Sequence, residues 1–180
     1  MAAVRSAPRE EAEQVTQLLG GEPVAVHERQ AGWARIETAY GYPGWVRQEA
    51  LGPPPQGAWP AAQERDVLAA ARAYLGAPYE WGGMSGRGID CSGLVHMAFR
   101  RTGVLVPRDS WQQAEAGEAV AEEDLVPGDL LFYEGHVAFW LGNGRVLHAT
   151  AREGVAAVVE EAEPPELAAR RVGCRRLVTS

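Results

Sequence analysis

Residues 136–148 read His-Val-Ala-Phe-Trp-Leu-Gly-Asn-Gly-Arg-Val-Leu-His, two largely apolar runs around a glycine-rich turn with a histidine at each end. Apolar runs of this length on either side of Gly-Asn-Gly predict a β-hairpin. The length of the turn sets the register, which decides whether His136 and His148 share a face of the sheet. A two-residue loop, Asn143-Gly144, would pair residue 139 with residue 148 and place the histidines on opposite faces.

A three-residue loop from Gly142 to Gly144 would instead pair Ala138 with His148. The two histidines would then be diagonal neighbours on one face, about 7–8 Å apart at Cα. We adopt this register because Gly144 can supply the left-handed residue that such a loop requires. The other face then carries apolar side chains and is expected to face the core: Val137, Phe139, Leu141 and Leu147.

The segments around the hairpin complete an α+β pattern. Further strands are predicted at 129–133, 155–160 and 171–178. Two helices are predicted before them. One spans 61–75, with Gly76 and Pro78 as stop signals, and the other spans 91–101, with Asp90 as its N-cap and Gly103 at its end. Helices followed by an antiparallel sheet are typical of an α+β domain.

A run of three prolines at 53–55 separates this domain from the residues before it. Proline fixes φ and removes a backbone donor, so the run cannot continue a strand or a helix. Short alternating runs at 23–28, 32–37 and 44–47 predict strands, and about fifty residues of short strands predict a small barrel or sandwich. We therefore expect a β unit at 1–55, a linker at 56–60 and an α+β domain at 61–180.

The charge balance argues against a nucleic-acid partner. The chain has 24 acidic and 17 basic residues and a net charge of −7, whereas phosphate binding needs clustered Lys and Arg. No segment approaches the ~20 apolar residues of a membrane span. Residues 1–14 carry charges of both signs without an apolar core, unlike a signal peptide. For the chain as it stands we expect a cytoplasmic protein with reduced thiols and no membrane partner.

Cys91 is the candidate nucleophile. It follows the expected cap Asp90 and would lie in the first turn of a helix, where the partial positive charge of the helix N-terminus favours the thiolate. His136 could take the thiol proton while His148 orients His136 and fixes its tautomer. The alternatives are that Cys91 is a small buried residue and that the histidines are unrelated. Cys174, between charged residues on a late strand, is interpreted as structural or incidental.

Several motifs, in consistent order, resemble the NlpC-type cysteine peptidases of bacterial peptidoglycan. They are Tyr-Glu-Trp-Gly-Gly at 79–83, Asp-Cys-Ser-Gly at 90–93, Pro-Arg-Asp-Ser-Trp-Gln-Gln at 107–113, Val-Pro-Gly-Asp-Leu-Leu-Phe at 126–132, and the hairpin itself. The resemblance runs from about residue 74 to residue 150. It implies a papain-like fold and a cysteine peptidase without a cofactor, in which Cys91, His136 and His148 are catalytic. It also implies that the Tyr79 hydroxyl and the Cys91 N–H stabilise the oxyanion.

The first fifty residues resemble a bacterial SH3-like domain at 15–24, 32–36 and 41–46. This pairing is similar to the branch that cleaves γ-D-glutamyl–diamino-acid bonds in short, released murein peptides. In that branch the SH3-like domain closes one end of the groove, so that only peptides with a free N-terminal L-Ala enter. The resemblance implies a role in cell-wall recycling and substrate contacts from Tyr42, Glu22, Trp81, Asp90, Ser92, Asp109 and Ser110. Tyr42 and Glu22 would meet the terminal amine.

Other functions remain open from the sequence alone. The chain could be an inert wall-peptide binding module, or a secreted hydrolase that acts on intact peptidoglycan. The same fold could also support amidase or acyl-transfer chemistry, since all of these reactions pass through a thioester. A Cys–His–His zinc site would lack a fourth ligand unless Asp90 turned inward, so no metal is expected.

Overall fold

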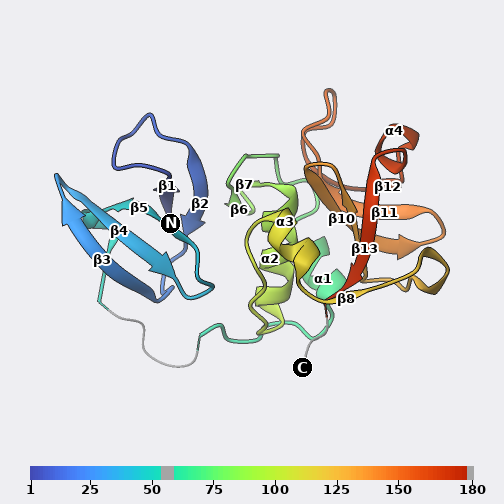
Figure 1. Cartoon of the computed structure of the whole chain (residues 1–180), viewed down its shortest axis with the longest axis horizontal. Coiled ribbons are helices and arrows are strands. Elements are labelled where there is room, and N and C mark those ends of the chain that lie inside the picture. The colour runs from blue at the N-terminus through green and yellow to red at the C-terminus, as the bar shows by residue number, and fades with distance from the viewer. Residues whose placement is uncertain (54–58, 178–180) are drawn as a thin grey trace.

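The N-terminal unit of the computed structural model, which describes residues 1–53 and 59–177, is a five-stranded antiparallel sheet. Its strand order is β2-β1-β5-β4-β3 (Figure 1). The strands are β1 (Ala2–Arg5), β2 (Gln14–Leu18), β3 (Val24–Gln30), β4 (Trp33–Thr38) and β5 (Pro43–Arg47). The three strands predicted from alternation are confirmed as β3 to β5. A small apolar core forms from Val4, Leu18, Ala34, Ile36 and Val46.

The second unit contains a six-stranded antiparallel sheet in the order β12-β11-β10-β9-β13-β8. Its strands are β8 (Glu118–Ala119), β9 (Leu130–Tyr133), β10 (His136–Gly142), β11 (Arg145–Ala149), β12 (Val158–Ala162) and β13 (Arg171–Arg176). The short strands β6 (Met84–Ser85) and β7 (Gly88–Ile89) form a separate pair. Helices precede the main sheet, so the predicted α+β class is confirmed.

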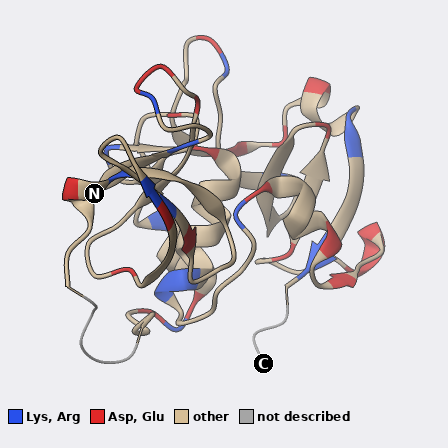
Figure 2. Ribbon diagram, turned by 60° about the vertical axis from the view of Figure 1, so that its left-hand side comes forward, with Lys and Arg blue, Asp and Glu red and all other residues tan. Residues whose placement is uncertain are grey.

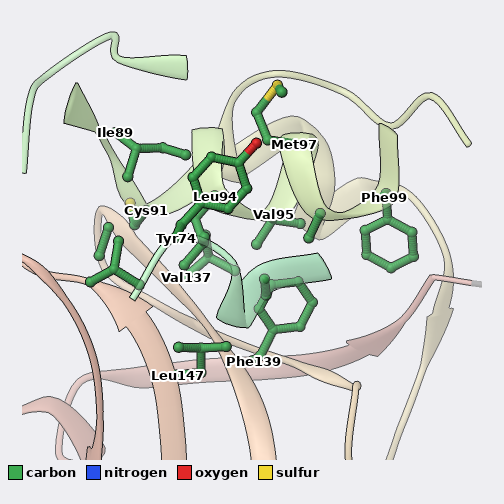
Figure 3. Packing of buried hydrophobic residues seen from close by; sticks show 14 of the residues in the cluster. Tyr74, Ile89, Cys91, Leu94, Val95, Met97, Phe99, Val137, Phe139 and Leu147 are labelled. Carbon is green, nitrogen blue, oxygen red and sulfur yellow. The ribbon is translucent and has the colours of Figure 1, made fainter. Parts of the chain in front are cut away.

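Helix α2 (Cys91–Arg101) lies between the N-terminal unit and the main sheet (Figure 1). Its bounds match the prediction. The predicted core face of the hairpin is confirmed for Val137, Phe139 and Leu147, which are buried against this helix (Figure 3). The other helices are short: α1 (Val67–Arg72), α3 (Ser110–Glu115), α4 (Pro165–Ala168) and the 3-10 turns η1 (Gln48–Ala50) and η2 (Glu122–Asp124).

The helix predicted at 61–75 is much shorter than expected. Asp66 caps α1 by accepting a hydrogen bond from the backbone N–H of Leu68 at 2.9 Å. The residues before it are held elsewhere, because the N–H groups of Gln63 and Glu64 both donate to the carbonyl of Arg101 at the end of α2. Helix-forming composition is therefore overridden here by a backbone contact with another element.

Two strand predictions shift or end beyond the described residues. Strand β12 begins at Val158, later than predicted, because Val155 and Ala156 both donate to the Arg152 carbonyl in a turn. Ala156 has a φ of 38°, which is incompatible with an extended strand. Residue 178, the last of the strand predicted at 171–178, lies outside the described residues. So do residues 56–58 of the predicted linker at 56–60.

The hairpin of β10 and β11 has the predicted register but a different turn. Phe139 pairs with Leu147, which places Ala138 opposite His148. The turn itself is the two-residue loop, with Asn143 and Gly144 both at positive φ. A bulge between Trp140 and Gly142 then shifts the pairing by one residue. The bulge, rather than a longer loop, puts both histidines on one face.

Buried polar contacts join the N-terminal unit to the second unit. The Glu22 carboxylate accepts from Arg100 of α2 at 3.0 Å. The Gln17 side-chain oxygen accepts from the Met84 backbone N–H at 2.9 Å. Arg108 donates to the Thr16 hydroxyl at 3.2 Å. These hydrogen bonds cross the contact and hold the N-terminal unit against the second unit, although the other Glu22 carboxylate oxygen is buried without a partner among the described residues.

Candidate active site

Cys91 is the first residue of α2, and its side chain is buried among the apolar residues below the helix (Figure 3). The Asp90 carboxylate accepts from the Gly93 N–H at 2.7 Å, which confirms the predicted N-cap. The backbone N–H of Cys91 belongs to the first turn of α2, where N–H groups have no intrahelical acceptor. Such an N–H beside a thiol is a suitable donor for an oxyanion.

The electrostatics of the thiol differ from the expectation. Burial, followed by the negative charge of Asp90, raises the pKa of Cys91 to about 11. Hydrogen bonds from the backbone of Val137 and of Ser92 lower it by less. Burial therefore outweighs the helix N-terminus, and the resting group is a neutral thiol. A partner base is needed to generate the nucleophile.

His136 and His148 meet as predicted. The Nε2 atom of His136 lies 2.8 Å from the Nδ1 atom of His148, and their ring planes are nearly perpendicular at 78°. Burial, then the neighbouring His148 and Arg170, lowers the pKa of His136 to about 3. Burial also lowers the pKa of His148, against an opposing hydrogen bond to Glu161. Both rings are therefore neutral at rest.

The thiol and the imidazoles line two adjoining cavities. A groove of about 770 Å³ contains Cys91, and a second cavity of about 420 Å³ contains His136 and His148. Tyr79 and Gly135 line both, so the two cavities meet there. Within the described residues no hydrogen bond joins the thiol to His136, which is common before a substrate closes such a contact.

Tyr79 stands at the junction of the two cavities. Among the described residues its hydroxyl makes no hydrogen bond, and the residue lines both cavities. Burial, then the nearby Cys91 and Asp90, raises the pKa of Tyr79 to about 12. The phenol therefore keeps its proton and can donate a hydrogen bond at neutral pH. This placement agrees with the oxyanion role that the resemblance implies.

Asp90 and Ser92 line the groove, but both are held by Arg108. The Arg108 guanidinium donates to the two Asp90 carboxylate oxygens at 3.0 and 2.7 Å, and to the Ser92 hydroxyl at 2.9 Å. Asp90 also accepts from the Gly82 N–H at 2.8 Å. The carboxylate therefore has a structural role at the start of α2, whatever else it contacts.

The other expected substrate residues separate into two groups. Tyr42, Trp81, Asp109 and Ser110 line the same groove as Cys91. The Tyr42 hydroxyl donates to the two Asp109 oxygens at 3.0 and 3.3 Å, which ties the N-terminal unit to the start of α3. Glu22 is outside this groove, because its carboxylate is buried and paired with Arg100. A contact between Glu22 and the substrate amine therefore finds no support in the fold.

The structure adds residues that the sequence analysis did not identify. Glu13 lines the groove, and its carboxylate accepts from the Trp81 indole N–H at 2.8 Å. Trp111 also lines the groove, and it is 61% exposed although it is a large apolar side chain. Glu161 accepts from the Nε2 atom of His148 at 2.9 Å. Trp111 lies in a quoted motif, whereas Glu13 and Glu161 stand in no motif and could not have been selected from the sequence.

Other candidate features fall outside the site. Cys174 is buried on β13 with Leu131, Ala138 and Val146, so it is a packing residue with a free thiol. In residues 1–53 and 59–177, no group of three or more His, Cys, Asp or Glu side chains could hold a metal ion. None of the helices described is long and apolar enough to cross a membrane. Basic and acidic residues are interspersed along the ribbon in the view of Figure 2.

Comparison with known proteins agrees with this architecture. Residues 76–174 match the NlpC/P60 family, and residues 2–52 match the bacterial SH3 domain. The chain is 37% identical over 133 residues to a gamma-D-glutamyl-L-lysine dipeptidyl-peptidase of Bacillus subtilis, covering 67% of this chain and 42% of that protein. It is 40% identical over 102 residues to one of Bacillus cereus, covering 52% of this chain and 30% of that protein. The chain thus spans less than half the length of both relatives.

Solved structures show the same fold. A crystal structure of an NlpC/P60 family protein from Bacillus cereus aligns with a TM-score of 0.60 and 28% identity, covering 99% of this chain and 61% of that one. RipD of Mycobacterium tuberculosis, described as a non-catalytic NlpC/P60 domain protein adapted to peptidoglycan binding, aligns with a TM-score of 0.53 and 26% identity over 62% of this chain and 95% of that one. Because the matched segment is more than half of the 180 residues, the chain belongs to the NlpC/P60 family and carries an N-terminal bacterial SH3 domain.

Proposed function

We propose that this protein is a cysteine endopeptidase that hydrolyses the γ-D-glutamyl–diamino-acid bond of short murein peptides with a free N-terminal L-Ala. The observation that carries the proposal is the composition of the groove beside Cys91. Glu13, Val15 and Tyr42 of the N-terminal unit line it together with Cys91 and Asp109 of the second unit. A wall from another unit limits the length of peptide that can precede the scissile bond.

The charges at this wall suit a terminal ammonium group. The carboxylates of Glu13 and Asp109 both line the groove, and the Tyr42 hydroxyl lies between the two units. An ammonium that leaves water needs carboxylates and polar acceptors around it. We therefore assign recognition of the substrate amine to Glu13 and Asp109 with Tyr42. The curated relatives named above are gamma-D-glutamyl-L-lysine peptidases, which supports a γ-D-glutamyl substrate.

The proposed reaction follows from the placement of the side chains. The thiol of Cys91 transfers its proton to His136, and the thiolate attacks the γ-carbonyl carbon of D-Glu. Tyr79 and the Cys91 N–H donate to the resulting oxyanion. The C–N bond breaks as His136 returns the proton to the leaving amine, which leaves a thioester on Cys91. A water molecule that gives its proton to His136 hydrolyses this thioester and restores the thiol.

The test is a mass-spectrometric digest with freshly reduced protein. The substrates are L-Ala-γ-D-Glu-L-Lys, the same peptide with meso-diaminopimelate, the N-acetylated peptides and intact peptidoglycan. We expect cleavage of the free peptides only, and none by Cys91→Ala. Equal cleavage of free peptide, blocked peptide and intact wall would contradict amine recognition and favour a hydrolase of intact peptidoglycan. Such a result would also remove the case for wall-peptide recycling.

A binding module is the second candidate, favoured by the similarity to non-catalytic RipD. Against it, Cys91, His136 and His148 are all residues competent for peptidase chemistry, and the two rings are hydrogen-bonded. Calorimetric titration of the free peptide into Cys91→Ala separates the candidates. Tight binding to this variant, together with no turnover by reduced wild type, would establish the binding module.

A further inference from the structure

Three polar side chains form a diagonal row across β10, β11 and β12. Ala138 lies opposite His148. His136 is two residues before Ala138 on β10, so its side chain is on the same face of the sheet as that of His148. In the next ladder His148 pairs with Val159, and Glu161 is again two positions away on that face. The ring of His148 consequently contacts His136 at 2.8 Å on one side and Glu161 at 2.9 Å on the other.

We propose that Glu161 is a positioning residue that imposes a single tautomer on both histidines and so leaves the Nδ1 atom of His136 free to accept the Cys91 proton. The inference deepens the proposed function and rests on it for its catalytic meaning. The proposal follows from which atoms can donate and which can accept a hydrogen bond, first in Glu161, then in His148 and then in His136.

The order begins at Glu161, which is held as a carboxylate. Arg152 donates to one of its oxygens at 2.6 Å, and the other oxygen faces His148. Burial raises the pKa of Glu161, but hydrogen bonds from Arg152 and His148 outweigh it, so the net pKa lies below the ordinary value. An ionised carboxylate only accepts hydrogen bonds. The Nε2 atom of His148 must therefore carry a proton.

The proton on the Nε2 atom of His148 fixes the tautomers of both imidazoles. A neutral ring carries one N–H, so the Nδ1 atom of His148 is an acceptor. The atom that faces it at 2.8 Å, Nε2 of His136, must then be the donor. This leaves the Nδ1 atom of neutral His136 with its lone pair. Without Glu161 the hydrogen bond between the two rings could run in either direction, with His136 or His148 as the donor. Only the direction in which His136 donates leaves a lone pair on its Nδ1 atom to accept the thiol proton.

The structure also offers a matched control on the same strand. Glu160 is the neighbouring residue on β12, and its carboxylate pairs with Arg72 of α1 at 2.6 Å. Side chains of adjacent strand residues point to opposite faces. Glu160→Gln therefore removes an equivalent carboxylate and leaves the histidine row unchanged, whereas Glu161→Gln replaces an acceptor with a group that can also donate.

The experiment reads the tautomers of the free protein by long-range ¹H–¹⁵N correlation of ¹⁵N-labelled histidine side chains at pH 7.5. We expect Nε2–H for both His136 and His148 in the wild type and in Glu160→Gln. We expect Nδ1–H, or a mixture, at His136 in Glu161→Gln. An Nδ1–H tautomer at His136 in the wild type would overturn the proposal even if every variant failed to fold.

A second readout uses the thiol and needs no murein substrate. The rate of Cys91 alkylation by iodoacetamide reports how readily His136 removes the thiol proton. We expect it to fall at least about tenfold in Glu161→Gln and to be unchanged in Glu160→Gln, because the wrong tautomer presents no base. Equal rates in the two variants would contradict the proposal. Since neither readout involves peptide hydrolysis, failure of this proposal is distinct from failure of the proposed function.

Discussion

Phe139 lies directly opposite Leu147 in the hairpin, and this pairing places His136 and His148 on the same face of the sheet. The pairing depends on the bulge between Trp140 and Gly142, because the two-residue turn alone would give a register shifted by one residue. Gly142, at the end of the bulge, has a φ of 88°. Only glycine adopts such a conformation without strain.

The bulge gives a stability prediction. Gly142→Ala is expected to lower the free energy of unfolding by about 1–2 kcal/mol, because a Cβ in this conformation is strained. Steric overlap adds nothing, since the added Cβ would meet only Pro127 Cγ, at an ordinary contact distance of 3.7 Å. Gly86→Ala is the control, because Gly86 has no positive φ and nothing within 4 Å of an added Cβ. Urea unfolding measures both variants. A loss for Gly86→Ala as large as that for Gly142→Ala would exclude backbone strain as the cause.

The pair of Asp90 and Arg108 predicts a second effect on stability. Arg108 is only 1% exposed and donates to both carboxylate oxygens of Asp90. Asp90→Asn keeps a helix cap but leaves a buried guanidinium uncompensated, at a cost of roughly 3 kcal/mol.

The matched control for this change is Asp66→Asn. Asp66 caps α1 through the Leu68 N–H at 2.9 Å and holds no buried arginine. Asparagine caps helices about as well as aspartate, so we expect a change of less than about 0.5 kcal/mol. Thermal unfolding followed by circular dichroism would compare the two, and similar midpoints would show that the ion pair contributes little.

Amine recognition predicts a change in KM. Glu13→Gln removes one negative charge from the proposed amine-binding wall of the groove, so KM for the free tripeptide is expected to rise about tenfold, the loss of one charge-assisted hydrogen bond. The kcat should change little, because Glu13 is proposed to bind the substrate amine and takes no part in the proposed bond cleavage. Glu10→Gln serves as the control, since Glu10 pairs with Arg47 at 2.7 Å and does not line the groove. A lower kcat in Glu13→Gln than in Glu10→Gln, with the same KM in both variants, would argue against this role.

His96 predicts how stability depends on pH. The ring is fully buried on α2 and contacts the Val106 carbonyl at 2.7 Å. Burial, then the charges of Arg108 and Arg100, lowers the pKa of His96 to about 3. The unfolded chain binds a proton at this residue below its ordinary pKa near 6.5, whereas the folded protein does not. The stabilising contribution is therefore complete above about pH 6.5 and falls as the pH decreases towards 3.

The test compares urea unfolding at pH 7.5 and pH 5 for the wild type and His96→Gln. Between pH 7.5 and pH 5, protonation of His96 in the unfolded chain should lower the free energy of unfolding of the wild type by roughly 2 kcal/mol. Glutamine does not titrate, so His96→Gln should not show this loss. The variant is consequently expected to lose about that much less stability on acidification. An equal loss in both proteins would show that His96 is not the group responsible.

Much of the fold was accessible from local sequence signals. Asp90 and Gly103 bound α2 because capping chemistry is local, and alternation around Asn143 and Gly144 located the hairpin. Predictions failed where distant contacts decide the structure. The N–H groups of Gln63 and Glu64 bond to the end of α2 rather than extending α1.

The residues of the candidate site also separate into those that local motifs indicate and those that distant contacts bring there. Cys91, His136 and His148 stand in motifs whose spacing already indicates their chemistry. Glu161 could not be selected, because its role depends on the pairing of β11 with β12, and the turn at Ala156 displaced that strand from its predicted position. Glu13 faces the groove only because another unit packs there. The thiolate expectation failed because burial of Cys91 cannot be read from its place in the chain.

The central claim is that the Cys91 sulfur attacks the γ-glutamyl carbonyl and carries the acyl group. Rapid acid quenching of reduced wild-type protein with L-Ala-γ-D-Glu-L-Lys, followed by intact-protein mass spectrometry and peptide mapping, measures this directly. We predict a transient L-alanyl-γ-D-glutamyl adduct on the peptide that contains Cys91, with release of free lysine. Lysine release without an adduct from Cys91→Ala, at the wild-type rate, would contradict the account.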